Sequence, residues 1–106
     1  IGNTGSFFKN PVISTREFEK LYHKYPEIPH YPSGEDVKIP AAWLIDQCGW
    51  KGKRFGDAGV HKMQALVIVN YGNATGTEIW ELAQRIQKSV EERFGVSLTP
   101  EVNIVS

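Results

Sequence analysis

The residues best suited to chemistry lie near the start of the chain, in segment 5–11, which reads GSFFKNP. Its glycine lets another group approach closely, and its two phenylalanines can exclude water. The amide of Asn10 offers both a donor and an acceptor beside the bend that Pro11 sets. The pattern predicts a site in which the hydroxyl of Ser6 is held in a dry pocket.

A second polar group stands at the far end of the chain, where segment 99–102 reads TPEV and supplies the carboxylate of Glu101. Each group also has a plain structural interpretation. A serine can simply satisfy the end of a strand, and a glutamate after a proline is often a solvated loop residue. The residues alone leave both interpretations open for Ser6 and Glu101.

Other chemistries have weaker support in the sequence. Ser6 and His61 could resemble a hydrolase pair, but there is no Gly-x-Ser-x-Gly turn and no acid placed to orient the imidazole. Cys48 is the single cysteine, so it cannot form an internal disulfide, and its place at a helix end disfavours a thiol nucleophile. The three histidines lack neighbours at metal-ligand spacing, so we expect no metal site.

Length and charge limit the classes of function. The 106 residues, 41% of them hydrophobic, are enough for one domain with a single core. Twelve basic and twelve acidic residues give a net charge of +0, so we expect no nucleic-acid or membrane partner and only local anion binding. No apolar run is long enough to span a bilayer and no signal pattern is present, which favours a cytoplasmic protein.

The first half of the chain predicts a strand, a helix and a loop. Segment 6–13 has the composition of an edge strand, with Pro11 limiting its pairing. A capping box at 14–17 predicts a helix that ends before Pro26. Three prolines and a glycine within 26–34 predict an exposed loop without regular structure.

The second half predicts two more helices and three strands, with turns between them. In order, they are a short strand at 37–39, a helix at 40–48 closed by Gly49, turns over 51–59, a central strand at 65–70, the longest helix from Thr75 or Thr77 to Phe94, and a last strand at 96–105 broken at Pro100. This alternation favours an α+β fold, a small mixed β-sheet packed with about three helices in a single domain.

Four motifs in order give the chain a resemblance to a known family. They are segments 5–11, 41–49 (AAWLIDQCG), 61–66 (HKMQAL) and 100–102 (PEV). Over nearly all its length the chain resembles the C-terminal, substrate-binding domain of UDP-N-acetylenolpyruvoylglucosamine reductase. That family uses NADPH, through bound FAD, to reduce the enolpyruvyl ether of UDP-N-acetylglucosamine to UDP-N-acetylmuramate in bacterial cell-wall synthesis.

The resemblance implies catalytic roles for two residues. Ser6 matches the serine that donates a proton to C2 of the enolpyruvyl group after hydride reaches C3, and Glu101 matches the glutamate beside it. Polar groups aimed at the developing enolate would lower the barrier. A serine can act as the acid because the carbanion is far more basic, provided that the geometry is preset.

The resemblance also implies four substrate-binding residues. Asn10 matches a residue near the substrate's phosphates, and Lys9 stands in the same motif. Tyr31 matches a loop tyrosine that closes over the nucleotide in one subtype of the family, and Gln64 matches a glutamine that contacts substrate. Their plain structural interpretations are a solvated lysine, a tyrosine packed on the surface and a turn hydrogen bond.

The family's FAD-binding region, with an arginine and a tyrosine of its active site, matches nothing in this chain. The resemblance therefore implies that FAD and NADPH act in the full-length enzyme, together with upstream FAD-binding domains of the same polypeptide. We expect the chain alone neither to bind FAD nor to turn over. Asn103 stands where many relatives have an arginine.

Two other functions fit the same residues. The chain could be a stand-alone nucleotide-sugar binding or regulatory module, or a purely structural domain. The first residue is Ile1 and the strongest motif begins within five residues of it, so we expect a piece of a longer protein in which another domain supplies the opposite wall of the cleft.

Overall fold

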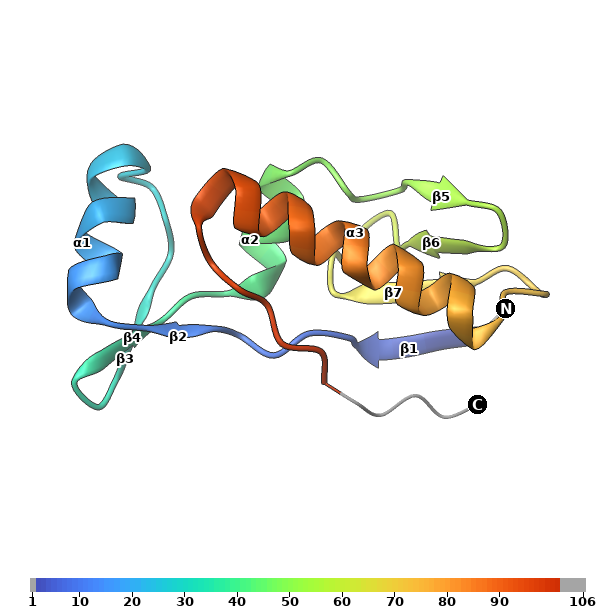
Figure 1. The fold of residues 1–106 in the computed structure, drawn as a ribbon, viewed down its shortest axis with the longest axis horizontal. Coiled ribbons are helices and arrows are strands. Elements are labelled where there is room, and N and C mark those ends of the chain that lie inside the picture. The colour runs from blue at the N-terminus through green and yellow to red at the C-terminus, as the bar shows by residue number, and fades with distance from the viewer. Residues whose placement is uncertain (1, 102–106) are drawn as a thin grey trace.

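Three helices and two small sheets make up the computed structural model, which describes residues 2–101, the first five of these through their main chain (Figure 1). The helices are α1 (Thr15–Lys24), α2 (Ala41–Gln47) and α3 (Gly76–Phe94). The strands are β1 (Gly2–Ser6), β2 (Val12–Ile13), β3 (Tyr31–Ser33), β4 (Asp36–Lys38), β5 (Arg54–Phe55), β6 (Ala58–Val60) and β7 (Val67–Asn70). The predicted α+β class is confirmed.

Local side-chain caps determine where the two longer helices begin. Ser14 and Glu17 form a complete capping box at the start of α1, and Thr75 and Glu78 form the same box at the start of α3. Gly95 ends α3 in the left-handed conformation, with φ of 69°, which glycine adopts without steric cost. The predicted bounds of both helices are therefore confirmed, with Thr75 as the cap.

The described strands form two antiparallel sheets instead of the one mixed sheet expected from the sequence. One sheet has the order β1-β7-β6-β5, and the other has the order β2-β4-β3. Pairs β3–β4 and β5–β6 are joined by two-residue turns, and such short connections allow only antiparallel pairing. The predicted central strand is β7, which lies between β1 and β6.

The molecule is elongated, with extents of 43 × 24 × 20 Å. The three-stranded sheet and α1 form one end, the four-stranded sheet forms the other, and α3 crosses the larger sheet (Figure 1). The apolar face of α3 and the strands of the larger sheet make up much of the core. This part of the core includes Ala58, Val60, Ile68, Ile79, Leu82, Ala83, Ile86 and Val90.

Three predicted elements differ from the structure in the first sixty residues. Segment 6–13 is not one strand, because β1 ends at Ser6 and β2 begins only at Val12. The predicted loop at 26–34 contains β3, where Pro32 is tolerated because β3 is an edge strand. The predicted turns at 51–59 contain the β5–β6 hairpin.

The predicted last strand is reduced, within the described residues, to a single antiparallel bridge between Phe8 and Pro100. Val96 and Leu98 before it are buried in the core. The rest of that prediction, at 102–105, lies outside the described residues. Within 2–101, no helix is both long and apolar enough to cross a membrane.

Candidate functional site

The two motifs from opposite ends of the chain meet in the structure. The carbonyl of Phe7 accepts a hydrogen bond from the amide of Glu101 at 2.7 Å, and the amide of Lys9 donates to the carbonyl of Thr99 at 2.9 Å. Glu101 therefore lies beside the residue that directly follows Ser6. The main chains of the predicted acid and the predicted carboxylate converge, while the side chain of Ser6 is outside what the structure describes.

Aromatic rings pack beneath this meeting point. Phe7 and Phe8 are each only 2% exposed, and their rings meet edge to face with centroids 5.2 Å apart. Trp80 of α3 adds a second edge-to-face contact with Phe7, at 5.9 Å. On the side of the larger sheet, the amide of Phe7 donates to the carbonyl of Leu66 at 2.8 Å. The predicted burial of the phenylalanine pair is confirmed.

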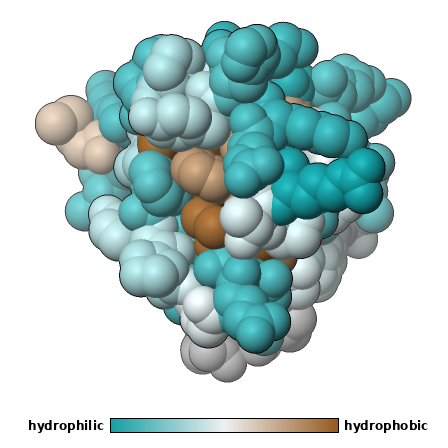
Figure 2. Space-filling model, turned by 90° about the vertical axis from the view of Figure 1, so that its left-hand side faces the viewer, coloured by the Kyte–Doolittle hydropathy of each residue, from teal (hydrophilic) through white to brown (hydrophobic). Residues whose placement is uncertain are grey.

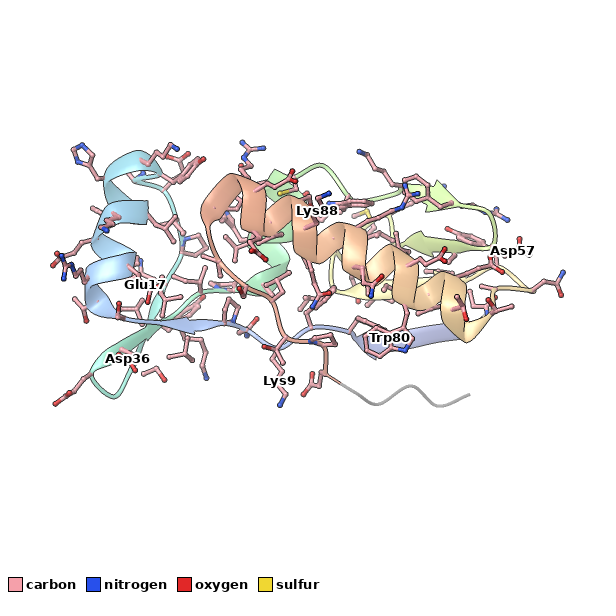
Figure 3. The ribbon with its side chains drawn as sticks, in the orientation of Figure 1. Lys9, Glu17, Asp36, Asp57, Trp80 and Lys88 are labelled. Carbon is pink, nitrogen blue, oxygen red and sulfur yellow. The ribbon has the colours of Figure 1, made fainter. Side chains whose placement is uncertain are left out.

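Lys9 and Glu101 are the charged residues at this meeting point. Lys9 is exposed and Glu101 is half-buried. Figure 3 shows the Lys9 side chain pointing away from the body of the domain beside the C-terminal segment, while Trp80 reaches from α3 toward β1. A polar ligand bound here would lie near the charged residues Lys9 and Glu101 and close to the buried phenylalanine rings.

Asn10 has a structural role that its sequence motif did not reveal. Its Oδ1 accepts a hydrogen bond of 2.9 Å from the amide of Ala41, the first residue of α2. The cap position of that helix is Pro40, which makes no side-chain cap, so Asn10 satisfies an amide that would otherwise lack a partner. The bond also fixes the Asn10 side chain, leaving the Nδ2 donor in a defined position.

Gln64 lies on the larger-sheet side of the motif. Its carbonyl accepts from the amide of Val67 at 3.0 Å, the turn hydrogen bond that its plain interpretation required. Its exposed side chain borders an open hollow of about 590 Å³, together with Trp43 of α2 and Met63. Because Gln64 stands two residues before Leu66, this hollow adjoins the segment that holds Phe7.

Tyr31 is not brought to the same place. It begins β3 in the smaller sheet, at the end of the molecule that carries α1, and is 57% exposed (Figure 1). Within the described residues, the structure therefore groups Ser6, Lys9, Asn10 and Glu101 around one segment, with Gln64 next to it. Tyr31 lies outside this group, on the smaller sheet.

A second hollow of about 410 Å³ lies between α1 and the end of α3. Leu21 and Phe94 contribute apolar lining, and charged side chains of both helices stand around it. Seen from that end, the surface has a small apolar hollow surrounded by hydrophilic side chains (Figure 2). None of the predicted site residues lines it, so it is not part of the candidate site.

A flavin dinucleotide, which the resemblance assigns to the full-length enzyme, needs a site for its pyrophosphate. The pyrophosphate of such a cofactor is often held at a free helix N-terminus. Glu17 and Glu78 occupy those of α1 and α3 with carboxylates, and Asn10 caps α2. Within residues 2–101 there is also no group of three or more His, Cys, Asp or Glu side chains that could hold a metal.

Cys48 directly follows α2, away from these groups, and folding changes the pKa of its thiol. Burial raises the pKa of its thiol, and the side chain of Ser89 and the charge of Arg93 offset this only in part. A raised pKa leaves less thiolate at neutral pH, which is the nucleophilic form. This agrees with the sequence-based expectation that Cys48 is not a nucleophile.

The groups that sequence reasoning missed are main-chain carbonyls. Leu66 and Thr99 hold the motif through their oxygen atoms, which any residue type would present. The apolar residues around Leu66 and the proline after Thr99 were the only sequence features that indicated main-chain pairing by these segments. No side-chain pattern could have identified the partners.

Comparison with known proteins agrees with the resemblance. Residues 1–105 match the family model described as UDP-N-acetylenolpyruvoylglucosamine reductase, C-terminal domain. Proteins named UDP-N-acetylenolpyruvoylglucosamine reductase are 57% identical over 106 residues in Flavobacterium johnsoniae and 54% identical over 106 residues in Porphyromonas gingivalis. These matches cover 99% of this chain but 32% and 31% of the relatives. In Chromobacterium violaceum the identity is 54% over 102 residues, 95% of this chain and 30% of the relative. The chain thus spans about a third of their length.

Proposed function

Because this chain belongs to the family of UDP-N-acetylenolpyruvoylglucosamine reductase, as its C-terminal domain, we propose that it binds the substrate and donates the proton in that reaction. The complete enzyme would be a cytoplasmic oxidoreductase that uses FAD and NADPH. It would convert UDP-N-acetylenolpyruvoylglucosamine to UDP-N-acetylmuramate for peptidoglycan synthesis. The chain itself would contribute one wall of the active-site cleft.

The proposed chemistry places a demand on this wall. When bound to the remainder of the enzyme, the flavin would supply hydride to C3 of the enolpyruvyl group. Negative charge then develops on C2 and the adjoining carboxylate, and a proton must reach C2. Groups that stabilise this charge as it forms lower the barrier, since they are already oriented. This chain has to present a proton donor at a fixed position.

Ser6 would be that donor, with Glu101 beside it. An alcohol is a weak acid, so it can serve only a strongly basic carbanion and only from a preset position. The observation that carries the proposal is the hydrogen bond of 2.7 Å between Phe7 and Glu101, which joins the two ends of the chain next to Ser6. The buried rings of Phe7 and Phe8 would limit competing protonation by water.

The other predicted residues would bind the nucleotide sugar. Asn10 would contact the phosphates through Nδ2, while its Oδ1 remains on α2. Lys9 would add positive charge on the same side, and Gln64 would contact substrate from the border of its hollow. Tyr31 stands apart, so its role requires the substrate or the rest of the enzyme to extend to the smaller sheet.

The test separates the two half-reactions in the complete reductase. Ser6→Ala should leave flavin reduction by NADPH nearly normal and slow flavin reoxidation by enolpyruvyl substrate by at least about a hundredfold, the low end for general acid catalysis. Ser97→Ala is the matched control, because Ser97 is an exposed serine of the C-terminal segment. Fast reoxidation by the Ser6 variant would show that the acid has been assigned wrongly.

A further inference from the structure

The outer face of the smaller sheet carries a row of three exposed side chains. Lys38 of β4 lies directly opposite Val12 on one side and Tyr31 on the other. Residues opposite one another in antiparallel strands share a face, with Cβ atoms about 4.5–5.5 Å apart. Val12 is 48% exposed, Tyr31 is 57% exposed and Lys38 is also exposed, so the row faces solvent.

Strand β4 also connects this row to the motif at the start of the chain. Directly after Lys38, the amide of Ile39 donates to the carbonyl of Pro11 at 2.9 Å. Two residues later, the amide of Ala41 donates to Oδ1 of Asn10, also at 2.9 Å. Lys38 therefore stands in register with Tyr31 and only three residues along the chain from the partner of Asn10.

Charge distinguishes Lys38 from its neighbours. Neither the amide of Asn10 nor the phenol of Tyr31 is a cationic group, and Lys9 alone would balance only one of the two negative charges of a diphosphate diester. The chain has no net charge, and any attraction for an anion must come from a local cation. No carboxylate of the described residues forms an ion pair with Lys38, whereas Lys51 and Arg54 are paired with Asp46 and Asp57.

A carboxylate at one end of the face gives it a direction. Asp36 lies opposite Ser33 on the same outer face, toward the β3–β4 turn. It repels an anion placed at that end, so an anion beside Lys38 is favoured on the side of Pro11 and Asn10. The phenol of Tyr31 can donate to a phosphate oxygen there, and a lysine binds phosphate as a point charge.

From this arrangement we propose that Lys38 is a phosphate-binding residue, whose ammonium group pairs with the diphosphate of the nucleotide substrate beside Tyr31. The inference rests on the proposed function in that it takes the ligand to be a uridine diphosphate sugar. It adds a second cation, beside Tyr31, to the charge that Lys9 would supply next to Asn10. Lys38 would contribute to binding and not to the transfer of the proton.

The experiment uses UDP and uridine as probes in the complete reductase, because they differ only in the phosphates. Lys38→Met should weaken UDP binding about tenfold and leave uridine binding unchanged. Lys38→Arg, which keeps the charge, should stay within about threefold of the parent. In turnover, Lys38→Met should raise KM for the enolpyruvyl substrate with kcat unchanged, as expected for uniform binding.

Lys88→Met is the matched control, since Lys88 is an exposed lysine on α3, at a distance from the row in the sequence and on another element (Figure 3). It should change neither UDP nor uridine binding. Unchanged UDP affinity in Lys38→Met, or an equal loss for uridine, would overturn the assignment of Lys38. Failure of the proposed proton donor would instead appear as fast flavin reoxidation in Ser6→Ala, with the UDP result unaffected.

Discussion

Asn10 has two roles that one pair of substitutions can separate. Asn10→Ala removes the Oδ1 that accepts from Ala41 at 2.9 Å and leaves the first amide of α2 without its side-chain partner. Loss of a helix cap of this kind costs about 1 kcal/mol in free energy of unfolding. For a domain of this size, that lowers Tm by about 4–8 °C. Asn10→Asp keeps the acceptor and should retain nearly all of this stability.

The same aspartate should impair ligand binding. It replaces the proposed Nδ2 donor by a negative charge, and two like charges about 4 Å apart repel by about 1 to 4 kcal/mol, depending on the effective dielectric constant. We therefore expect UDP to bind the complete reductase at least about fivefold more weakly in Asn10→Asp.

Thermal unfolding of the 106-residue chain and UDP titration of the complete enzyme measure the two effects. Asn10→Ala should be destabilised, and Asn10→Asp should be stable but impaired in binding. An Asn10→Asp variant that binds UDP as tightly as the parent would refute the phosphate contact. An Asn10→Ala variant that melts at the parental temperature would refute the cap.

Three further predictions concern stability. At Gly59, an added Cβ would lie 2.9 Å from the carbonyl oxygen of Lys53, so Gly59→Ala should cost about 1–3 kcal/mol in urea unfolding, whereas Gly76→Ala, with nothing within 4 Å, should cost nothing. Ser89→Ala removes the acceptor of the buried Trp50 indole N–H (2.7 Å) and should cost about 1–3 kcal/mol in free energy of unfolding. The same substitution should cost less in a Trp50→Phe background, which has no indole N–H, and an equal cost in the two backgrounds would argue against the bond. Folding raises the pKa of the Cys48 thiol, so the contribution of Cys48 to stability is complete below the pKa of an unfolded thiol, about 8.5, and falls as pH rises through the pKa of the folded state. The difference in free energy of unfolding between the parent and Cys48→Ala should therefore shrink at alkaline pH. A difference that stays constant with pH would contradict the raised pKa.

The helices could be predicted from sequence because their signals are local. The capping boxes at Ser14 and Thr75 lie within four residues of chain, and the glycine that ends α3 follows directly after it. These interactions form within one turn of helix and need no distant partner. Their bounds agree with the structure for that reason.

The hairpins could not be predicted in the same way. β3 forms although it contains Pro32, because β3 is an edge strand that pairs only with β4, and an edge strand tolerates a residue without an amide hydrogen. β6 requires a bare backbone at Gly59, where the carbonyl of Lys53 approaches closely. Both depend on contacts between segments, which composition alone does not specify.

The same distinction between local signals and contacts between distant segments applies to the candidate site. Phe7 and Phe8 are recognisable as buried residues from their type. The approach of Glu101 to this segment depends on main-chain hydrogen bonds across more than ninety residues of chain, and it was expected only through the resemblance to a known family. The cap that Asn10 provides for α2 was not foreseen, because it depends on how the two segments cross.

The most direct test of the central claim is a double-mutant cycle on Ser6 and Glu101, read as the rate of flavin reoxidation by enolpyruvyl substrate in the complete reductase. Groups that act together on one developing charge are strongly non-additive. We expect the variant carrying both Ser6→Ala and Glu101→Gln to be hardly slower than the slower single variant. Rate losses that multiply would contradict the claim that the two side chains serve the same atom.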